Sequence, residues 1–493
     1  MLSNPESRIP PRAIWTLAGI VLLSVGLYLA FSGFYYRIGF PLDDAWIHQT
    51  YARNLALRGE WSFLPGQPSG GSTSPLWSAL LAVGYWLGLA PYLWTYFLGA
   101  LALWGLTVLG ESAVRRLVPA YRPRIPWIGI ALALEWHLVW AAASGMETLL
   151  FTLLATTTLV LLISGSQKYF SLGLLIGLSV WVRPDGLTLL GPAVFVILLV
   201  QPSWSKRLKA LLKLGVGFGG LFALYILFNL VISGSPLPNT FYAKQAEYAV
   251  ELNQPFFLRL GKETLPVLTG MGVFLLPGFV LTLISALQRR SWAVLAAAIW
   301  FVGFLALYAW RLPVTYQYGR YMMPAMPVFF LLGLAGLVKF SLVRVPHWRW
   351  IISMAWRLAA GGILVVFWGL GAFHYAQDVT FIESEMVATA RWVSANVPPG
   401  ALIAAHDIGA LGYFDGHDLV DLAGLVSPEV IPFFRDEDQI AAYLTRRGVS
   451  YLVTFPDWYQ HLALGLKPVF SASEPASQSL VTSNMTVYLW PGR

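Results

Sequence analysis

Two adjacent carboxylates, Asp43 and Asp44, stand in the segment PLDDAWIHQTYARN, just after the first apolar stretch of the chain. A carboxylate held at the mouth of an apolar cavity is suited to act as a general base, because desolvation raises its pKa toward neutrality. A helix that starts near Asp44 would carry His48 on the same face and Arg53 on the adjacent one. The alternative is that one of the two aspartates only caps this helix.

Further charged residues recur where later apolar segments meet polar ones. Glu147 in SGMETLLF and Asp185 in VRPDG each begin a predicted helix, so capping competes with a functional role for both. Arg183 lies at the same depth as Asp185 and is able to pair with a carboxylate or a phosphate. Lys244 and Arg320 are placed to hold a lipid phosphate, although basic residues beside a membrane also meet headgroups.

His406 and Asp407 belong to the tetrapeptide HDIG, which in soluble metal phosphohydrolases supplies a metal-binding pair. The surrounding segment, ALIAAHDIGALGYF, reads as a strand that runs into a glycine turn. The other metal-binding histidines of such enzymes have no obvious counterparts here. We therefore disfavour a metal phosphohydrolase.

These residues are carried by a very hydrophobic chain. Of its 493 residues, 57% are hydrophobic and only 11% are charged, whereas soluble domains are about 25% charged. At about 20 apolar residues per crossing, the chain has room for ten or more membrane spans and a further domain. An ordinary soluble enzyme and a disordered or fibrous chain are excluded. The absence of cysteine excludes disulfides and cysteine chemistry.

The apolar segments predict an α-helical polytopic membrane protein with about eleven spans. The first, Ala13 to Phe34, follows Arg8 and Arg12, and we interpret it as an uncleaved span that enters from the cytoplasm. The segment 75–90 is short and rich in aromatic residues, so we assign it to a juxtamembrane helix on the outer face. The other spans are expected near 91–112, 126–143, 147–164, 169–182, 186–201, 209–232, 264–287, 291–309, 323–341 and 350–372.

The net charge of +8 combines two opposite parts. Residues 1–375 carry 26 Lys and Arg against 11 Asp and Glu, a net charge of +15, and residues 376–493 carry 6 against 13, a net charge of −7. The basic excess therefore marks cytoplasmic loops of a protein in the cytoplasmic (inner) membrane and does not indicate nucleic-acid binding. This orientation places the N-terminus inside and the C-terminus outside.

Two domains are expected. Residues 1–375 form the transmembrane domain, with a first outer loop at about 35–74, and an amphipathic interfacial helix is predicted over 241–260. Residues 376–493 form a small extracytoplasmic α/β domain, in which ALIAA, LVDLA, YLVTF and MTVYLW read as strands. ESEMVATARWVSAN and DEDQIAAYLTRRG read as its helices.

In this order, PLDDAWIHQTYARN, GGSTSPLW, SGMET, VRPDG, PLPNTFYAK and GRYMMPAMP resemble the GT-C superfamily of membrane glycosyltransferases, which use polyprenyl-phosphate sugars as donors. They are similar to a bacterial branch that includes the terminal arabinofuranosyltransferase of mycobacterial arabinan. HDIGALGYF and VDLAGLVSPE are also typical of the C-terminal domain in that branch. The resemblance covers nearly the whole chain.

The resemblance implies a GT-C-like fold and transfer of a sugar from a polyprenyl-phosphate donor to a hydroxyl of a glycan, lipid or protein acceptor at the outer face of the membrane, in cell-envelope biosynthesis. A single displacement would invert the anomeric centre. Asp43 is then the prime candidate for the base with Asp44 its neighbour, although their roles could be exchanged, and Arg320 is a candidate contact of the donor phosphate. We further expect His48, Arg53, Arg183 and Lys244 to bind the donor or its phosphate, and the acceptor to be supported by Glu147, Asp185, Asn239, Tyr242 and Tyr318.

Metal dependence stays open, because the pair Asp43 and Asp44 could hold a divalent cation through oxygen ligands or work without one. The main alternative function is a membrane transporter or a flippase for lipid-linked sugars. Such proteins place ionisable residues near the bilayer midplane, where this chain offers only Glu135 and His137. A third alternative is a sensor whose outer domain binds a ligand.

Overall fold

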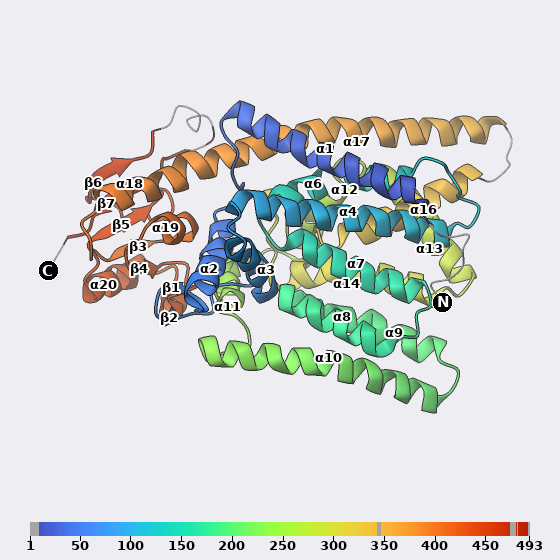
Figure 1. Cartoon of the computed structure of the whole chain (residues 1–493), viewed down its shortest axis with the longest axis horizontal. Helices are drawn as coiled ribbons and strands as arrows, with labels where there is room; N and C mark the ends of the chain where they lie inside the picture. Colours follow the sequence, from blue (N-terminus) through green and yellow to red (C-terminus); the bar gives the residue numbers. More distant parts are fainter. Residues whose placement is uncertain (1–8, 343–346, 474–479, 481, 492–493) are drawn as a thin grey trace.

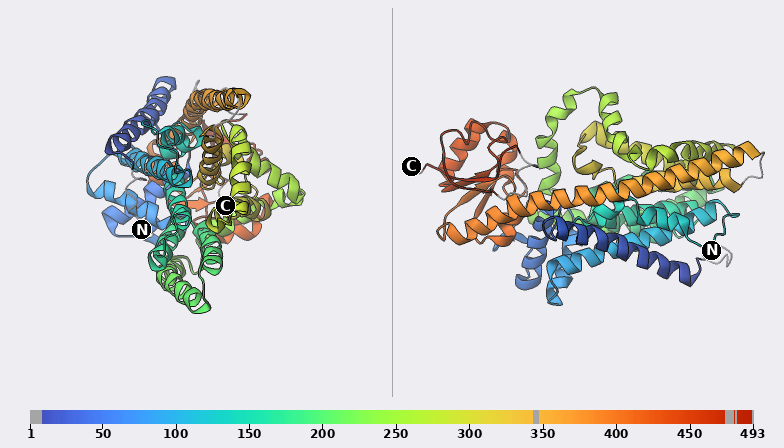
Figure 2. Two further views of the ribbon diagram at one scale, coloured as in Figure 1. Left: turned by 90° about the vertical axis from the view of Figure 1, so that its right-hand side faces the viewer. Right: turned by 90° about the horizontal axis from the view of Figure 1, so that it is seen from above.

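A bundle of long helices carries a small α/β domain at one end (Figure 1). The computed structural model describes residues 9–342, 347–473, 480 and 482–491. Arg8, which the sequence places before the first span, lies outside these residues. The first helix begins at the end of the bundle opposite the α/β domain (Figures 1 and 2).

Predominantly apolar helices run along the long axis of the bundle. Because a helix satisfies its own backbone hydrogen bonds, such segments are stable in lipid. They are α1 (Pro11–Tyr35), α4 (Pro91–Leu117), α7 (Thr148–Ile163), α8 (Tyr169–Val182), α9 (Leu190–Val200), α10 (Trp204–Ser233), α13 (Gly272–Gln288), α14 (Trp292–Arg311), α16 (Met326–Leu342) and α17 (His347–Phe381).

Among the described residues, five helical stretches are long and apolar enough to cross a membrane: α1, α4, α10, α14 and the stretch Trp350–Asn396. A sixth crossing results if α12 (Phe256–Leu268) and α13, which meet at a bend of 103°, count as one span. Shorter apolar helices occupy Thr148–Ile163, Tyr169–Val182, Pro184–Val200 and Met326–Leu342. The chain is thus a multi-pass membrane protein, and its number of about eleven spans stays a prediction.

Several predicted spans are interrupted. The span expected at 126–143 consists of α5 (Trp127–Ala133) and α6 (Trp136–Ala143), and the side chain of Glu135 between them caps α6 by accepting from the Leu138 amide. The span expected at 186–201 begins as the 3-10 helix η2 (Pro184–Leu189) and continues as α9.

The helix predicted over 241–260 was wrong as a continuous element. The segment folds as α11 (Asn239–Glu247), η3 (Ala249–Asn253) and α12. Pro255 lies at the break, because a proline disfavours helical geometry in the residue before it, and Gln254 is indeed extended with ψ 148°. The interruption leaves α11 as a separate short helix beside the α/β domain (Figure 1).

The loop after α1 folds over the same end of the bundle as the α/β domain (Figure 1). It contains α2 (Asp44–Arg58), the two-stranded antiparallel hairpin β1 (Ser62–Leu64) and β2 (Gln67–Pro68), and α3 (Pro75–Trp86). The helix expected to start near Asp44 is therefore present. The segment assigned to a juxtamembrane helix is α3, a 12-residue helix that packs against α2.

One continuous helical path joins the bundle to the α/β domain, as the right-hand view of Figure 2 shows. α17 passes through a π-helical segment, η4 (Ile382–Val387), into α18 (Ala388–Asn396). The domain boundary proposed at residue 375 lies inside this path. A continuous helix restricts how far the domain can turn relative to the bundle.

The α/β domain holds a five-stranded mixed sheet in the order β4-β3-β5-β7-β6. The pairs β3–β4 and β3–β5 are parallel, whereas β5–β7 and β6–β7 are antiparallel. The strands are β3 (Ile403–Ala405), β4 (Leu419–Asp421), β5 (Tyr451–Thr454), β6 (Lys467–Ser471) and β7 (Thr486–Leu489). Four of them coincide with predicted strands, and β6 was missed.

Helices cover both faces of this sheet. Along β3, Ile403 and Ala405 belong to the core that extends into the bundle, whereas Ala404 packs into a second cluster with Ile440 and Leu444 of α20 (Glu437–Arg447). This alternation follows the two-residue period of a strand. The remaining elements are the short helix α15 (Tyr316–Gly319), α19 (Gly409–Phe414) and the 3-10 helix η5 (Pro428–Phe433).

Candidate active site

A cavity of about 240 Å³ opens at the N-terminus of α2, at the end of the bundle that faces the α/β domain. We call it the first cavity. Its walls combine apolar side chains with an unusual density of charge. The lining residues are Asp44, Ile47, His48, Gly71, Thr73, Met146, Glu147, Thr148, Arg183, Pro184, Asp185, Thr240, Phe241, Lys244, Gln245, Leu307, Tyr308, Arg311, Leu312, Arg320, Tyr321 and Leu425.

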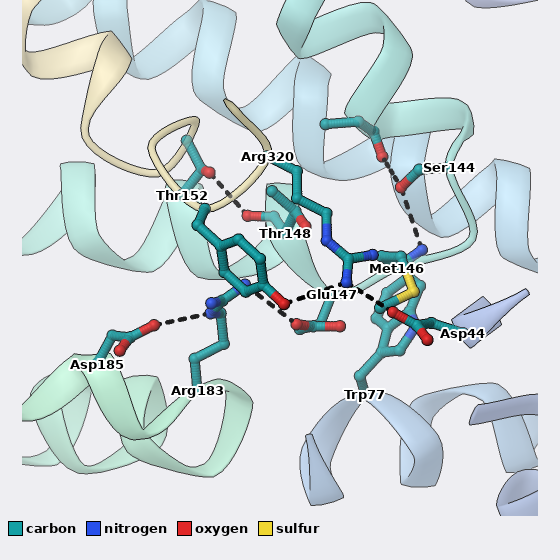
Figure 3. A network of polar contacts seen from close by, with 12 residues as sticks. Asp44, Trp77, Ser144, Met146, Glu147, Thr148, Thr152, Arg183, Asp185 and Arg320 are labelled. Atoms are coloured by element: carbon teal, nitrogen blue, oxygen red, sulfur yellow. Dashed lines mark hydrogen bonds and ion pairs between the residues drawn. The ribbon is translucent and has the colours of Figure 1, made fainter. Parts of the chain in front are cut away.

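Asp44 and Arg320 form the closest ion pair of the first cavity, with 2.6 Å between Asp44 Oδ2 and Arg320 Nη2 (Figure 3). Burial by itself would raise the pKa of Asp44, but the charges of Arg320 and Lys244 outweigh it and lower the pKa to about 2. The Asp44 side chain is 32% exposed and that of Arg320 only 5%. The base candidate that can meet a substrate is therefore Asp44.

The Arg320 guanidinium has one nitrogen whose hydrogen-bond donors are not used by the described residues. Its Nη2 bonds Asp44 and the hydroxyl of Tyr321, whereas its buried Nη1 has no hydrogen-bond partner among the described residues. A buried donor without a partner is costly. A phosphate oxygen fits a guanidinium well, although Nη1 itself has almost no exposed surface in this arrangement.

A second network lies across the cavity and centres on Arg183 (Figure 3). Its Nη1 lies 3.4 Å from Glu147 Oε1, its Nε lies 2.9 Å from Asp185 Oδ2, and its Nη2 donates to the Tyr308 hydroxyl at 3.0 Å. Tyr308 in turn donates to Asp185 at 2.6 Å. Arg183 is thus occupied by protein partners and fixes this wall.

Glu147 also meets His48, whose Nε2 lies 3.3 Å from Glu147 Oε2. The other ring nitrogen of His48 contacts the Ser78 hydroxyl at 3.0 Å. Glu147 occupies the N-cap position of α7 but makes no capping hydrogen bond. The Glu147 carboxylate instead contacts His48 and Arg183 in the cavity network.

Lys244 reaches the first cavity from α11 and pairs with Glu247 at 2.9 Å, one helical turn further on. Burial would lower the pKa of Lys244, but Tyr316, Glu247 and Asp44 outweigh it and hold the pKa well above its usual value. The side chain is therefore a cation at neutral pH. With Arg320, it gives the cavity two positive groups beside Asp44.

Asp43 does not line the first cavity. It is 8% exposed and turns to the α/β domain, where its two carboxylate oxygens accept from the backbone amides of Gly409 and Ala410 at 2.7 and 2.8 Å. It stands at the N-cap position of α2 without a capping bond. The interpretation of Asp43 as a helix cap is therefore wrong, because its carboxylate accepts from the backbone of α19 instead.

The contact between Asp43 and α19 also explains why the last residue of HDIG, Gly409, is a glycine. A Cβ on Gly409 would lie 2.1 Å from the Asp43 carbonyl oxygen, so only glycine allows this approach. The segment that was expected to be a glycine turn forms the short helix α19 instead. Burial, Asp43 and Asp44 together raise the pKa of Asp407 well above its usual value.

Four other predicted site residues lie outside the first cavity. Arg53 donates to the backbone carbonyls of Tyr413 and Gly412, so it docks the α/β domain. Asn239 donates to the Leu425 carbonyl at 3.2 Å and has a similar docking role. Tyr242 is half-exposed, and Tyr318 donates to Asp378. Neither tyrosine lines the first cavity.

Within the described part of the chain, no group of three or more His, Asp or Glu side chains is arranged to hold a metal ion. The oxygens of Asp43 are taken by two backbone amides and Asp44 is paired with Arg320. The pair that the sequence offered for a divalent cation is thus divided between two environments.

Sequence reasoning missed several residues of the first cavity, notably Thr148, Tyr308, Arg311 and Tyr321. Tyr321 directly follows Arg320 in GRYMMPAMP, so the motif could have drawn attention to it. Tyr308 and Arg311 stand at the end of an apolar helix, α14, and carried no local signal. Their place becomes visible only when α14 packs beside α7 and η2.

Comparison with known proteins agrees with this arrangement. Residues 374–488 match the model of a family described as a domain of unknown function (DUF8728). The chain is 26% identical over 420 residues to the terminal beta-(1->2)-arabinofuranosyltransferase of Mycobacterium tuberculosis. The alignment covers 76% of this chain and 64% of that protein, so the chain spans slightly less than two thirds of the length of that relative.

Solved structures show the fold. ArnT from Cupriavidus metallidurans matches in the apo state with a TM-score of 0.56 and 16% identity, over 96% of this chain and 98% of that one. The same protein bound to undecaprenyl phosphate matches with a TM-score of 0.54 and 16% identity, over 97% and 98%. An oligosaccharyltransferase from Archaeoglobus fulgidus matches with a TM-score of 0.52 and 12% identity, over 89% of this chain and 68% of that one. The predicted resemblance to GT-C glycosyltransferases is confirmed, and the fold is theirs.

Proposed function

We propose that this protein transfers a sugar from a polyprenyl-phosphate donor to an acceptor hydroxyl at the outer face of the membrane, with inversion of the anomeric centre. The observation that carries the proposal is the pairing of Asp44 with Arg320 in a cavity that also holds Lys244. A carboxylate beside two cations provides a base for the acceptor and a counter-charge for a phosphate leaving group. The similarity to an arabinofuranosyltransferase supports the same reaction class.

The donor is proposed to place its phosphate against Arg320 and Lys244. Arg320 Nη1 is a buried donor without a described partner, and a phosphate oxygen would satisfy it. Apolar side chains of the same cavity, including Met146, Leu307 and Leu312, offer a surface to the first isoprenoid units. The undecaprenyl phosphate bound to the fold neighbour ArnT is a ligand of this chemical class.

Asp44 is proposed to be the general base in place of Asp43. In the empty site its pKa is lowered to about 2 by the cations that outweigh burial. Phosphate binding to Arg320 and Lys244 would offset these charges, so the pKa of Asp44 would rise when the donor arrives. The acceptor hydroxyl then gives its proton to Asp44 and attacks the anomeric carbon from the side opposite the phosphate.

The Arg183 network is proposed to hold the wall that positions the acceptor. Arg183 itself has three protein partners, so we assign it to positioning and not to the donor phosphate. Glu147, which was expected to support the acceptor, and His48, which was expected to bind the donor or its phosphate, both line the cavity and stay candidates for these roles. The acceptor is a glycan, lipid or protein hydroxyl.

The residues that favoured a transporter or flippase have structural partners. Glu135 accepts from the Leu138 amide at 3.0 Å and lies 2.8 Å from His137 Nδ1. The Glu135 carboxylate therefore caps α6 and pairs with His137, whose Nε2 is buried without a hydrogen-bond partner among the described residues. The capping role accounts for Glu135 without an ion path.

The experiment that tests the proposal uses the purified full chain in detergent or nanodiscs. It is incubated with a panel of decaprenyl- and undecaprenyl-phosphate sugars and with glycan, lipid and peptide acceptors, and the products are identified by mass spectrometry. We expect one donor to yield a product that is absent with Asp44→Asn. Net movement of intact lipid-linked sugar across a vesicle membrane, without product formation from any donor, would favour the flippase instead.

A further inference from the structure

A second cavity, of about 420 Å³, lies where the α11–η3 segment meets the α/β domain. Four aromatic side chains line it: Tyr248, Phe434, Trp458 and Tyr459. Between them stand the polar groups of Glu247, His406, Arg435 and Glu437. The proposed transfer reaction uses none of these residues.

The aromatic wall is ordered around His406. Its Nδ1 lies 2.9 Å from the Tyr459 hydroxyl, and its ring meets Trp458 edge to face with 5.1 Å between centroids. Phe434 also meets the imidazole in an edge contact, with 5.8 Å between centroids. Trp458 is nevertheless 48% exposed, so much of its surface stays open to a ligand.

The polar groups are held in place by the protein. Glu437 Oε2 accepts from the Leu462 amide, and Arg435 donates to the backbone carbonyl of Glu247. Burial lowers the pKa of His406 to about 4, so at neutral pH the imidazole is uncharged, with one donor and one acceptor. Glu247 is paired with Lys244, which leaves Glu437 and Arg435 as the other charged groups of the lining. The cavity therefore has no excess of positive charge that would favour a phosphate.

The two cavities share a wall. Lys244 faces the first cavity and Glu247 the second, and the two side chains pair at 2.9 Å across one turn of α11. The two residues that connect the cavities are therefore about one helical turn apart on α11, roughly 5 Å along the helix axis.

We propose that the second cavity binds the neutral saccharide chain of the acceptor and thereby presents its terminal hydroxyl to Asp44. Aromatic faces pack against the apolar faces of sugar rings, while carboxylates, an arginine and a neutral histidine bond their hydroxyls. This inference extends the proposed function, and it rests on that function for the identification of the saccharide as the acceptor. It assigns His406 of HDIG to saccharide binding.

Direct binding tests this assignment without requiring transfer. Fluorescently labelled mono-, tri- and hexasaccharides built of arabinofuranose or of hexopyranose are titrated onto the purified full chain. We expect a hexasaccharide to bind more tightly than the matching monosaccharide, and Trp458→Ala to weaken hexasaccharide binding about tenfold. Trp458→Phe should retain part of the affinity, because an aromatic face remains.

Two controls separate the cavity from the rest of the molecule. Leu464→Ala removes an exposed side chain of the same domain outside the cavity walls and should leave saccharide binding unchanged. Binding of undecaprenyl phosphate should be the same in Trp458→Ala as in the unmodified chain. Equal saccharide affinity of Trp458→Ala and the unmodified chain, or no saccharide binding by the unmodified chain, would overturn the inference. Saccharide binding that depends on Trp458 without transfer from any donor would refute the proposed function alone.

Discussion

Asp43 and Asp44 are neighbours in the chain, yet they serve two different regions of the molecule. Asp43 is buried against the α/β domain and holds the backbone of α19. Asp44 is partly exposed in the first cavity and pairs with Arg320. Their pKa values diverge accordingly. Burial raises that of Asp43 to about 7, whereas Arg320 and Lys244, acting against burial, lower that of Asp44 to about 2.

This difference shows how two adjacent acidic residues can have separate roles. Successive residues at a helix start point in directions about 100° apart, and here the two carboxylates contact different partners. The carboxylate of Asp43 contacts the α/β domain, and that of Asp44 lines the first cavity. The docking contact and the proposed base are therefore one residue apart, and the following variants test whether their roles are separable.

The largest effect is expected from Asp44→Asn. An amide cannot take the proton of the acceptor hydroxyl, so the transfer rate should fall by roughly 10²–10⁴, while the affinity for undecaprenyl phosphate and the apparent melting temperature stay close to those of the unmodified chain. Rates by mass spectrometry and thermal unfolding in detergent measure both quantities. Glu60→Gln, a change at another carboxylate of the first loop, should keep full transfer. Full activity of Asp44→Asn would remove Asp44 from the reaction.

Arg320→Ala should rank next. Loss of the phosphate contact is expected to reduce kcat/KM by about 10²–10³. Because Arg320 depresses the pKa of Asp44, its removal should also raise that pKa, and the acid limb of the pH profile of kcat/KM should move to higher pH. Arg58→Ala, which removes an exposed cation at the end of α2, is the matched control. An unmoved acid limb would contradict the assignment of Asp44 as the titrating base.

Gly409→Ala tests the docking region. The added Cβ would meet the Asp43 carbonyl oxygen at 2.1 Å, so α19 must shift away from α2. We expect a lower apparent melting temperature and faster proteolysis of the α/β domain, with a smaller loss of transfer than in Asp44→Asn. Gly416→Ala in the same domain, where a Cβ meets nothing within 4 Å, should leave both unchanged. Equal behaviour of the two variants would mean that the contact at Asp43 does not dock the domain.

The smallest effect is expected from Asp43→Asn, and its signature is pH dependence. The folded pKa of Asp43, about 7, lies above its unfolded value of about 3.9. Protonated Asp43 therefore makes its full contribution to the stability of the folded chain below about pH 4, and this contribution is lost as the pH rises to about 7. Asparagine does not titrate, so this part of the pH dependence should vanish.

Apparent melting temperatures of both chains between about pH 4 and pH 8 measure that difference. The variant also leaves one of two backbone amides without an acceptor, at a cost of about 1–3 kcal/mol. Parallel pH curves for the two chains would exclude Asp43 as the titrating group.

Part of this structure could be predicted from local sequence. The start of α2 at Asp44 and the strands β3, β4, β5 and β7 follow from patterns a few residues long. Interruptions were harder to predict. The break at Glu135 interrupts an apolar run at a single charged residue, and the 3-10 start of α9 begins with the short polar segment 184–186, so neither marked where the helix geometry changes. Strand β6 was missed because it is mostly exposed and shows no alternation of apolar residues.

The candidate site was predicted unevenly for a similar reason. Its charged members were found, since charge is rare in apolar surroundings and therefore conspicuous. Their partners were not, because Arg320 and Asp44 stand 276 positions apart and nothing local links them. Residues such as Arg53 and Asn239 looked equally suitable in sequence but bond the α/β domain instead.

The sequence by itself determined that the chain enters a membrane and that carboxylates and basic residues share particular loops, because composition and hydropathy act over short distances along the chain. Only the tertiary structure decided which of the two carboxylates lines the first cavity. That choice depends on the direction of each side chain at the start of α2 and on the arrival of Arg320, Lys244 and Gly409 from distant segments. A pKa follows from such neighbours and from burial, so the division of work between Asp43 and Asp44 is a property of the fold.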